Sequence, residues 1–120
     1  MFVNLLKAKI HRATVTGSDL NYEGSIAICP DLIEASGILI NEKVEIYNIN
    51  NGNRFETYVI RGKPGEISLN GAAARLVMPG DKIIICAYCW LSPEEARYHA
   101  PRIVLVTENN KMIESKNDSR

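Results

Sequence analysis

The dipeptide Gly24-Ser25 has the composition of a self-cleavage site. A serine hydroxyl can attack the carbonyl carbon of the preceding residue and convert the peptide bond to an ester, and a preceding glycine removes the side chain that would crowd this attack. If the ester is lost by β-elimination, the serine becomes dehydroalanine, and loss of ammonia then leaves a pyruvoyl group on a new amino terminus. Gly-Ser is also a common loop dipeptide, so the rest of the chain must decide between the two interpretations.

A predicted hairpin carries an arginine and a tyrosine on one face. Residues 44–49 and 54–60 are rich in strand-forming side chains, and residues 50–53 between them accept positive φ angles. Arg54 and Tyr58 are four residues apart, so strand alternation puts them on one face and Thr57 on the other. The guanidinium of Arg54 suits a carboxylate, and a phenol with a pKa of about 10 can donate a proton at neutral pH. A solvated arginine and a half-buried strand tyrosine are the alternatives.

Residues 70–74, with the sequence Asn-Gly-Ala-Ala-Ala, predict a tight turn that enters a helical turn. Free backbone N–H groups at such a point could receive an anion, and small side chains would let a ligand approach the backbone closely. The alternative is a plain turn whose alanines serve packing.

Four blocks, residues 9–16, 20–25, 51–58 and 70–74, resemble the pyruvoyl-dependent aspartate 1-decarboxylases in order and approximate spacing. The resemblance implies a small closed six-stranded double-psi β-barrel that assembles as a homotetramer. It also implies self-cleavage into residues 1–24 and 25–120, and decarboxylation of L-aspartate to β-alanine for pantothenate biosynthesis. The covalent pyruvoyl group derived from Ser25 would bind the substrate as a Schiff base and accept the electrons released with carbon dioxide. A maturation helper protein is a further partner to consider.

The resemblance assigns roles to individual residues. Ser25 is the pyruvoyl precursor, Tyr58 the proton donor, and Thr57 a group that supports the acyl shift at the Gly24 carbonyl. Strand alternation separates Thr57 from Tyr58, so a bulge or a contact with a neighbouring subunit must reconcile their roles. The other candidate substrate-binding residues are Lys9, Arg54, Thr57, Gly71, Ala72 and Ala73, and a wider set of pocket candidates comprises His11, Tyr22, Tyr47, Asn70 and Ile84. Several relatives carry tryptophan where this chain has Tyr47, which changes the shape expected of the pocket.

Short strands must position these groups, because runs rich in Val, Ile, Thr and Tyr alternate with turn signals. The predicted strands are residues 2–16, 25–28, 44–49, 54–61, 66–69, 82–90 and 102–107. Two short helices are predicted: residues 31–36, closed by Gly37, and residues 93–98, where Ser92 and Glu95 form a capping box. Residues 79–81 predict another turn. This pattern indicates a mainly β protein, and even spacing of short strands favours a small closed barrel.

Composition narrows the function classes. The 120 residues predict one domain, and 14 basic residues balance 14 acidic ones, which disfavours nucleic-acid binding. The amino terminus lacks the pattern of a signal peptide, and the longest apolar run, residues 83–91, is too short for a membrane span, so we expect a cytoplasmic protein. From about residue 108 the chain turns polar, which predicts a flexible tail.

The 3 cysteines are expected to be reduced and packed rather than bound to a metal. Cys86 and Cys89 have the spacing of a redox or zinc motif, but they lie in a strand, where residues three apart point to opposite faces. No metal site is therefore predicted.

Two other functions remain alternatives. One is a non-enzymatic β-barrel that binds or regulates a partner, with Gly24-Ser25 as an ordinary loop. The other is a hydrolase that uses Ser25 and His11, which is disfavoured because the sequence has no nucleophile elbow and no orienting acid.

Overall fold

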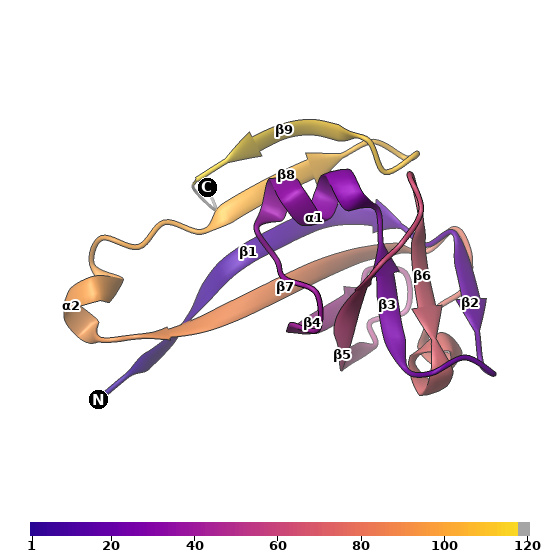
Figure 1. The fold of residues 1–120 in the computed structure, drawn as a ribbon, viewed down its shortest axis with the longest axis horizontal. Helices are drawn as coiled ribbons and strands as arrows, with labels where there is room; N and C mark the ends of the chain where they lie inside the picture. Colours follow the sequence, from indigo (N-terminus) through magenta and orange to yellow (C-terminus); the bar gives the residue numbers. More distant parts are fainter. Residues whose placement is uncertain (118–120) are drawn as a thin grey trace.

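The computed structural model describes residues 1–117, which form a mainly β structure with short helices (Figure 1). In these residues 9 strands join in one sheet, in the order β2-β6-β3-β5-β4-β7-β1-β8-β9. The elements are β1 (Val3–Thr14), β2 (Gly17–Asp19), β3 (Ser25–Ile28), α1 (Pro30–Ser36), β4 (Lys43–Asn48), β5 (Arg54–Arg61), β6 (Ile67–Asn70), the 3-10 helix η1 (Gly71–Leu76), β7 (Lys82–Leu91), α2 (Pro93–Ala96), β8 (Arg102–Val106) and β9 (Met112–Lys116).

The mainly β prediction is confirmed, and each predicted strand region contains an observed strand. The sheet is not closed in the described residues, because β2 and β9 are its two edges. The predicted closed six-stranded double-psi barrel is therefore not confirmed. Strand spacing along a chain does not specify which strands pair, and pairing determines whether a sheet closes.

β5 changes its pairing partner along its length, whereas β1 has one partner on each side. β5 pairs antiparallel with β4 through Arg54 to Tyr58, and then parallel with β3 through Val59 to Arg61. β1 pairs antiparallel with β7 and, at residues 8–11, parallel with β8. Figure 1 shows β1 and β7 as a long twisted pair that runs most of the length of the molecule. These two strands therefore connect β4 on one side of the pair to β8 on the other.

The core lies on one face of this sheet. Ile10, Ile85 and Ile46 are successive cross-strand partners on β1, β7 and β4, and all three are fully buried. Phe55 of β5 pairs with Ile46 and packs against the same cluster. Leu32, which is fully buried, attaches α1 to the core. Burial of such side chains is the main stabilising contribution in a domain of this size.

The predicted end of the first helix at Gly37, the capping box of the second helix and the predicted turns are confirmed, but α2 ends at Ala96 rather than at residue 98. Gly37 ends α1 with a left-handed φ of 73°, and α2 has both hydrogen bonds of the capping box between Ser92 and Glu95. Gly52 has a φ of 79° in the β4–β5 hairpin, and Gly80 a φ of 94° in the turn before β7. Among the described residues, no helix combines the length and apolar character that crossing a membrane would require.

The polar segment after Thr107 is more structured than its composition predicted. Residues 112–116 form β9, which pairs antiparallel with β8, so the flexible tail predicted from about residue 108 is wrong for this strand; residues 118–120 lie outside the described residues. Asn110 is 2% exposed with a φ of 61° in the turn before β9. Its side chain accepts a hydrogen bond from Thr14 N at 2.7 Å and donates to Thr14 O at 2.9 Å and Gly65 O at 3.0 Å. The hydrogen bonds of the Asn110 side chain to distant backbone groups thus fix this segment, which has few apolar residues to bury.

Replacement of Asn110 should therefore destabilise the protein. Asn110→Ala removes three hydrogen bonds to part-buried backbone groups and places alanine at a positive φ angle, so the free energy of unfolding should fall by about 2–4 kcal/mol. Asn109→Ala is the matched control, because that side chain is exposed, and should change the free energy by less than about 0.5 kcal/mol. Urea denaturation measures both, and equal values would contradict the role assigned to Asn110.

Candidate functional site

Ser25 is held by a hydrogen-bond network at the start of β3. The residue is 1% exposed, whereas Gly24 before it is exposed. Ser25 Oγ accepts a hydrogen bond from Asn70 Nδ2 at 3.0 Å and donates to Glu23 O at 3.3 Å. Ser25 and Asn70 are also cross-strand partners of β3 and β6. The Ser25 hydroxyl is therefore oriented by the Asn70 side chain and lies next to the Gly24–Ser25 peptide bond, where cleavage is expected.

Gly71 packs directly on the backbone of Gly24. A Cβ atom at Gly71 would lie 2.7 Å from Gly24 Cα and 3.1 Å from Tyr22 O, and the φ angle of Gly71 is +65°. The predicted helical turn within residues 70–74 is confirmed as η1, and Asn70 before it is the last residue of β6 with an extended backbone. Ala73 is buried and Ala72 is exposed beside this contact. Only a residue without a side chain fits at position 71 in this arrangement.

Tyr22 and Asn70 share a cleft with the residues around β3. This cleft of about 450 Å³ is also lined by Ala27, Ile60 and Ser68. Tyr22 is 56% exposed. The cleft therefore reaches the segment next to Ser25 from the solvent.

β5 carries Thr57 and Tyr58 to the same end of β3. Ile26 and Val59 are the first Cα partners of the parallel β3–β5 pair, and Ser25 and Tyr58 immediately precede them. Thr57 is half-buried on the face of β5 that includes the buried Val59, and Tyr58 is 37% exposed on the other face. The β4–β5 register runs without a shift, so no bulge brings Thr57 and Tyr58 to one face. The bulge expected as one way to reconcile the two predicted roles is therefore not found at this point of β5.

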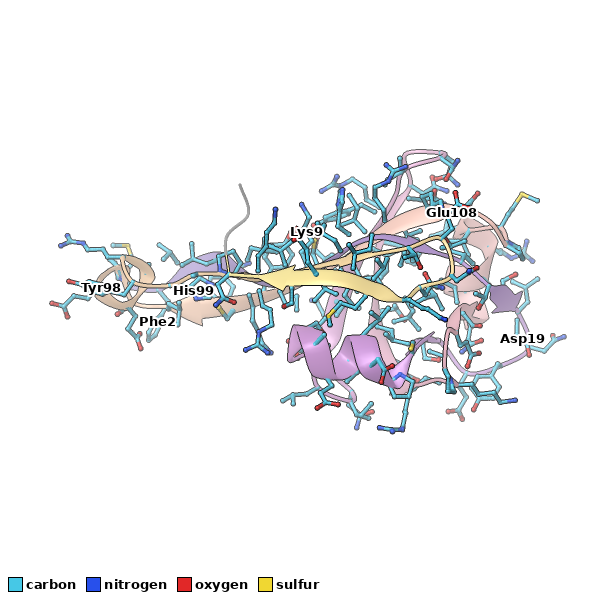
Figure 2. The ribbon with its side chains drawn as sticks, turned by 90° about the horizontal axis from the view of Figure 1, so that it is seen from above. Phe2, Lys9, Asp19, Tyr98, His99 and Glu108 are labelled. Carbon is cyan, nitrogen blue, oxygen red and sulfur yellow. The ribbon has the colours of Figure 1, made fainter. Side chains whose placement is uncertain are left out.

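The other predicted substrate residues lie on the outer face of the sheet. Tyr47 of β4 is the cross-strand partner of Arg54 and of Ile84, and Arg54 Cζ lies 3.8 Å from the centroid of the Tyr47 ring. Lys9 of β1 pairs with Cys86 of β7, which in turn pairs with Glu45 of β4. Figure 2 shows Lys9 near the middle of the long axis, on the side of β9 away from α1. The opposite side of this sheet is the buried core.

Within a single chain, most of the predicted site residues thus lie in two separate places. The processing group lies where β3 begins and β6 ends, and comprises Gly24, Ser25, Asn70, Gly71, Ala72, Ala73 and Tyr22. The outer-face group comprises Lys9, Tyr47, Arg54, Tyr58 and Ile84. β5 connects the groups, since it pairs with both β3 and β4.

His11 lies apart from Ser25, at a distortion of β1. The β1–β7 register shifts between Ile10 and Ala13, and Arg12 there has a φ of 66°. His11 pairs with Leu105 of β8, and its Nδ1 atom is buried without a hydrogen-bond partner. Burial, followed by the positive charge of Lys9, lowers the pKa of His11. The neutral form is therefore favoured.

The cysteines are free thiols: Cys29 and Cys86 are buried and Cys89 is half-buried. Burial raises the pKa of Cys86, which disfavours the reactive thiolate. Within residues 1–117 no group of His, Cys, Asp and Glu side chains is arranged to hold a metal ion.

Sequence reasoning missed two residues of the outer face, Glu45 and Tyr88. Both contact Tyr47, whose hydroxyl donates to Glu45 Oε1 at 3.0 Å and lies 2.7 Å from the hydroxyl of Tyr88. Glu45 shares a face with Tyr47 by strand alternation, a signal that was present in the sequence. The contact with Tyr88 depends on the pairing of β4 with β7, which no local pattern reveals.

The family model for aspartate decarboxylase matches residues 1–113, which include both groups of predicted site residues. The chain belongs to the aspartate decarboxylase family. The family resemblance inferred from four sequence blocks is therefore confirmed.

Relatives in this family match the chain over nearly its whole length. An aspartate 1-decarboxylase from Bdellovibrio bacteriovorus is 63% identical over 120 residues, which are 100% of this chain and 97% of the relative. One from a Hydrogenobaculum species is 61% identical, covering 96% of this chain and 92% of the relative. One from Caldicellulosiruptor saccharolyticus is 60% identical, covering 98% and 93%.

The packing of Gly71 on Gly24 can be tested by its cost in stability. Gly71→Ala and Gly52→Ala both place alanine at a positive φ angle, but a Cβ at Gly52 meets nothing within 4 Å. Gly71→Ala should therefore lose about 1–3 kcal/mol more free energy of unfolding than Gly52→Ala. Urea denaturation in a Ser25→Ala background avoids any effect of cleavage at residue 25. Equal losses would show that the Gly24 segment moves aside freely.

Proposed function

We propose that this chain is a self-processing aspartate 1-decarboxylase that converts L-aspartate to β-alanine and carbon dioxide. The observation that carries this function is identity of 60–63% to aspartate 1-decarboxylases over nearly the full length of each chain. The reaction would supply β-alanine to pantothenate biosynthesis. The buried, hydrogen-bonded Ser25 beside an exposed glycine supports the processing step.

In this proposal the chain cuts itself between Gly24 and Ser25. Ser25 Oγ attacks the Gly24 carbonyl carbon and a proton passes to the departing amide nitrogen, so that an ester replaces the peptide bond. Elimination removes the Ser25 Cα proton and breaks the Cβ–Oγ bond, which releases Gly24 as a free carboxylate and leaves dehydroalanine. Addition of water and loss of ammonia then give the pyruvoyl group. The products are residues 1–24 and residues 25–120.

The surroundings of Ser25 fit this chemistry. Asn70 Nδ2, at 3.0 Å from Ser25 Oγ, orients the hydroxyl, and Gly71 leaves room for the Gly24 backbone because it has no Cβ atom. We assign the stabilisation of negative charge at the Gly24 carbonyl to the Thr57 hydroxyl. Thr57 lies two residues before Val59, the cross-strand partner of Ile26, which supports this assignment. The pyruvoyl group, once present at residue 25, supplies an electron sink for the decarboxylation.

The outer-face residues bind and protonate the substrate in this proposal. Arg54 and Lys9 are cationic groups for the carboxylates of L-aspartate, and Tyr58 donates a proton to the substrate carbon after carbon dioxide leaves. Arg54 and Tyr58 share a face of β5, as a clamp and its proton donor require. Gly71, Ala72 and Ala73 contact the substrate beside residue 25.

We further propose that the active enzyme is a homotetramer with sites shared between neighbouring copies. The separation of the processing group from the outer-face group supports this assembly, because a second copy could bring its outer face to the processing group of the first. Exposed apolar side chains support it too, among them Leu20, Tyr22, Leu39 and Trp90. A maturation helper protein would act before this site is complete.

Maturation is tested by mass. Fragments of 24 and 96 residues, the second with a carbonyl that reacts with hydrazine, should appear in denaturing mass spectrometry of purified and heat-incubated protein. Ser25→Ala should remain a single chain and make no β-alanine. Only intact wild-type chain, without a reactive carbonyl, would contradict self-processing.

Substitutions of Thr57 and Tyr58 should impair different stages, self-cleavage for Thr57 and decarboxylation of substrate for Tyr58. Thr57→Val keeps the side-chain volume but deletes the hydroxyl, so cleavage should slow by about 100-fold and uncut chain should accumulate. Tyr58→Phe should cut normally but lower kcat for β-alanine formation by at least about 100-fold, because the proton donor is lost. Fragment masses and β-alanine production score both variants, and each is the control for the other. Normal maturation of Thr57→Val, or wild-type turnover by Tyr58→Phe, would remove the role of that residue.

A further inference from the structure

Arg54 is held in place without an acidic partner. No ion pair of Arg54 occurs among residues 1–117, and the side chain is exposed. Its guanidinium carbon lies 3.8 Å from the centroid of the Tyr47 ring, a distance at which a cation is attracted to the face of an aromatic ring. Stacking fixes the plane of the guanidinium and leaves its N–H groups free to bind a carboxylate.

Two glutamates on the same sheet face could pair with Arg54, but both are engaged elsewhere. Glu45 and Glu56 are cross-strand partners, and Glu56 lies two residues from Arg54 on β5. Glu56 pairs with Lys43 at 2.7 Å, and Glu45 accepts a hydrogen bond from the Tyr47 hydroxyl at 3.0 Å. The ring that stacks on Arg54 thus belongs to the same side chain that donates a hydrogen bond to Glu45, which unlike Glu56 has no ion pair among the described residues.

The Tyr47 hydroxyl has one hydrogen, and this fixes the direction of its hydrogen bonds to Glu45 and Tyr88. A carboxylate can only accept, so the single hydroxyl hydrogen of Tyr47 goes to Glu45. The Tyr88 hydroxyl, 2.7 Å away, then donates to the Tyr47 oxygen. Burial, helped by the hydrogen bonds to Tyr88 and Glu45, raises the pKa of Tyr47. Tyr47 therefore remains a donor throughout the neutral pH range.

We infer that Tyr47 is a positioning residue for Arg54: its ring orients the guanidinium, and its hydroxyl, supported by Tyr88, keeps the Glu45 carboxylate from occupying the site where the substrate carboxylate binds. The inference rests on the proposed function, in which Arg54 binds L-aspartate. It also gives a role to tyrosine at this position, because the hydroxyl has a task that an aromatic ring alone does not perform.

Tyr47→Phe separates the two tasks. The phenylalanine ring can still stack on Arg54, but Glu45 loses its donor and can turn to the guanidinium, where it competes with substrate. KM for L-aspartate should rise about three- to fivefold, the range expected for competition by one partly exposed carboxylate, with kcat per pyruvoyl group unchanged. Tyr47→Leu removes the ring as well and should raise KM about tenfold or more.

The matched rescue is Tyr47→Phe combined with Glu45→Gln. Because the amide carries no charge, it should not compete, and KM should return to within about twofold of wild type. Glu45→Gln alone should change KM little, since the amide oxygen still accepts from Tyr47. Tyr98→Phe is the control for loss of a distant hydroxyl, because Tyr98 is 88% exposed beside α2. Tyr88→Phe, which weakens the support of Tyr47, should raise KM in the same direction by a smaller factor.

Steady-state kinetics should be measured with the fragment ratio, hydrazine-reactive carbonyl and thermal unfolding of each variant. An unchanged KM in Tyr47→Phe, with wild-type protein making β-alanine, overturns the inference alone. A raised KM that Glu45→Gln does not reverse overturns the role of the hydroxyl against Glu45. If Tyr47→Phe does not fold, Tyr88→Phe and its double variant with Glu45→Gln decide by the same criteria. Mature wild-type protein without β-alanine formation would instead overturn the proposed function, and the inference with it.

Discussion

The arrangement of the candidate site depends on one strand with two pairing partners. β5 pairs with β4 through Tyr58 and with β3 from Val59 onward, without a break between the two ladders. The strand therefore joins the outer face, which carries Arg54, to the start of β3, where Ser25 lies. Backbone hydrogen bonds on both sides fix its position, so its side chains have little freedom to move along the strand. A one-residue slip would exchange the faces of Thr57 and Tyr58.

Alternation along β5 also limits what one chain can do. Thr57 faces the core side near Ser25, and Tyr58 faces outward with Arg54, so two neighbouring residues serve different surfaces. In the proposed function these surfaces correspond to forming the pyruvoyl group and to using it. Since successive side chains of a strand point to opposite faces, the proposed assembly would bring the outer face of one copy to the processing group of another.

Local features of the fold were predictable from the sequence, and long-range pairings were not. Gly52, Gly37 and the Ser92 capping box each depend on neighbours within a few residues, and the structure confirms all three. The four sequence blocks at residues 9–16, 20–25, 51–58 and 70–74 were sufficient to identify the family. β2 pairs with β6, a strand far along the chain. β9 pairs with its neighbour β8, but the turn that leads into it is fixed by Asn110, whose partners Thr14 and Gly65 lie in other segments. The Tyr47–Tyr88 contact was missed for the same reason.

The outer face illustrates why a binding arginine benefits from a neutral neighbour. An acidic partner would fix Arg54, but the substrate carboxylate would then have to displace that partner. Exchange of one carboxylate for another at Arg54 would contribute little net free energy to substrate binding. An aromatic ring fixes the guanidinium without using its N–H groups. The carboxylates that remain nearby must then be bound by other donors, as Glu56 is by Lys43 and Glu45 by Tyr47. The electrostatics of the site therefore depend on residues that need never contact the substrate.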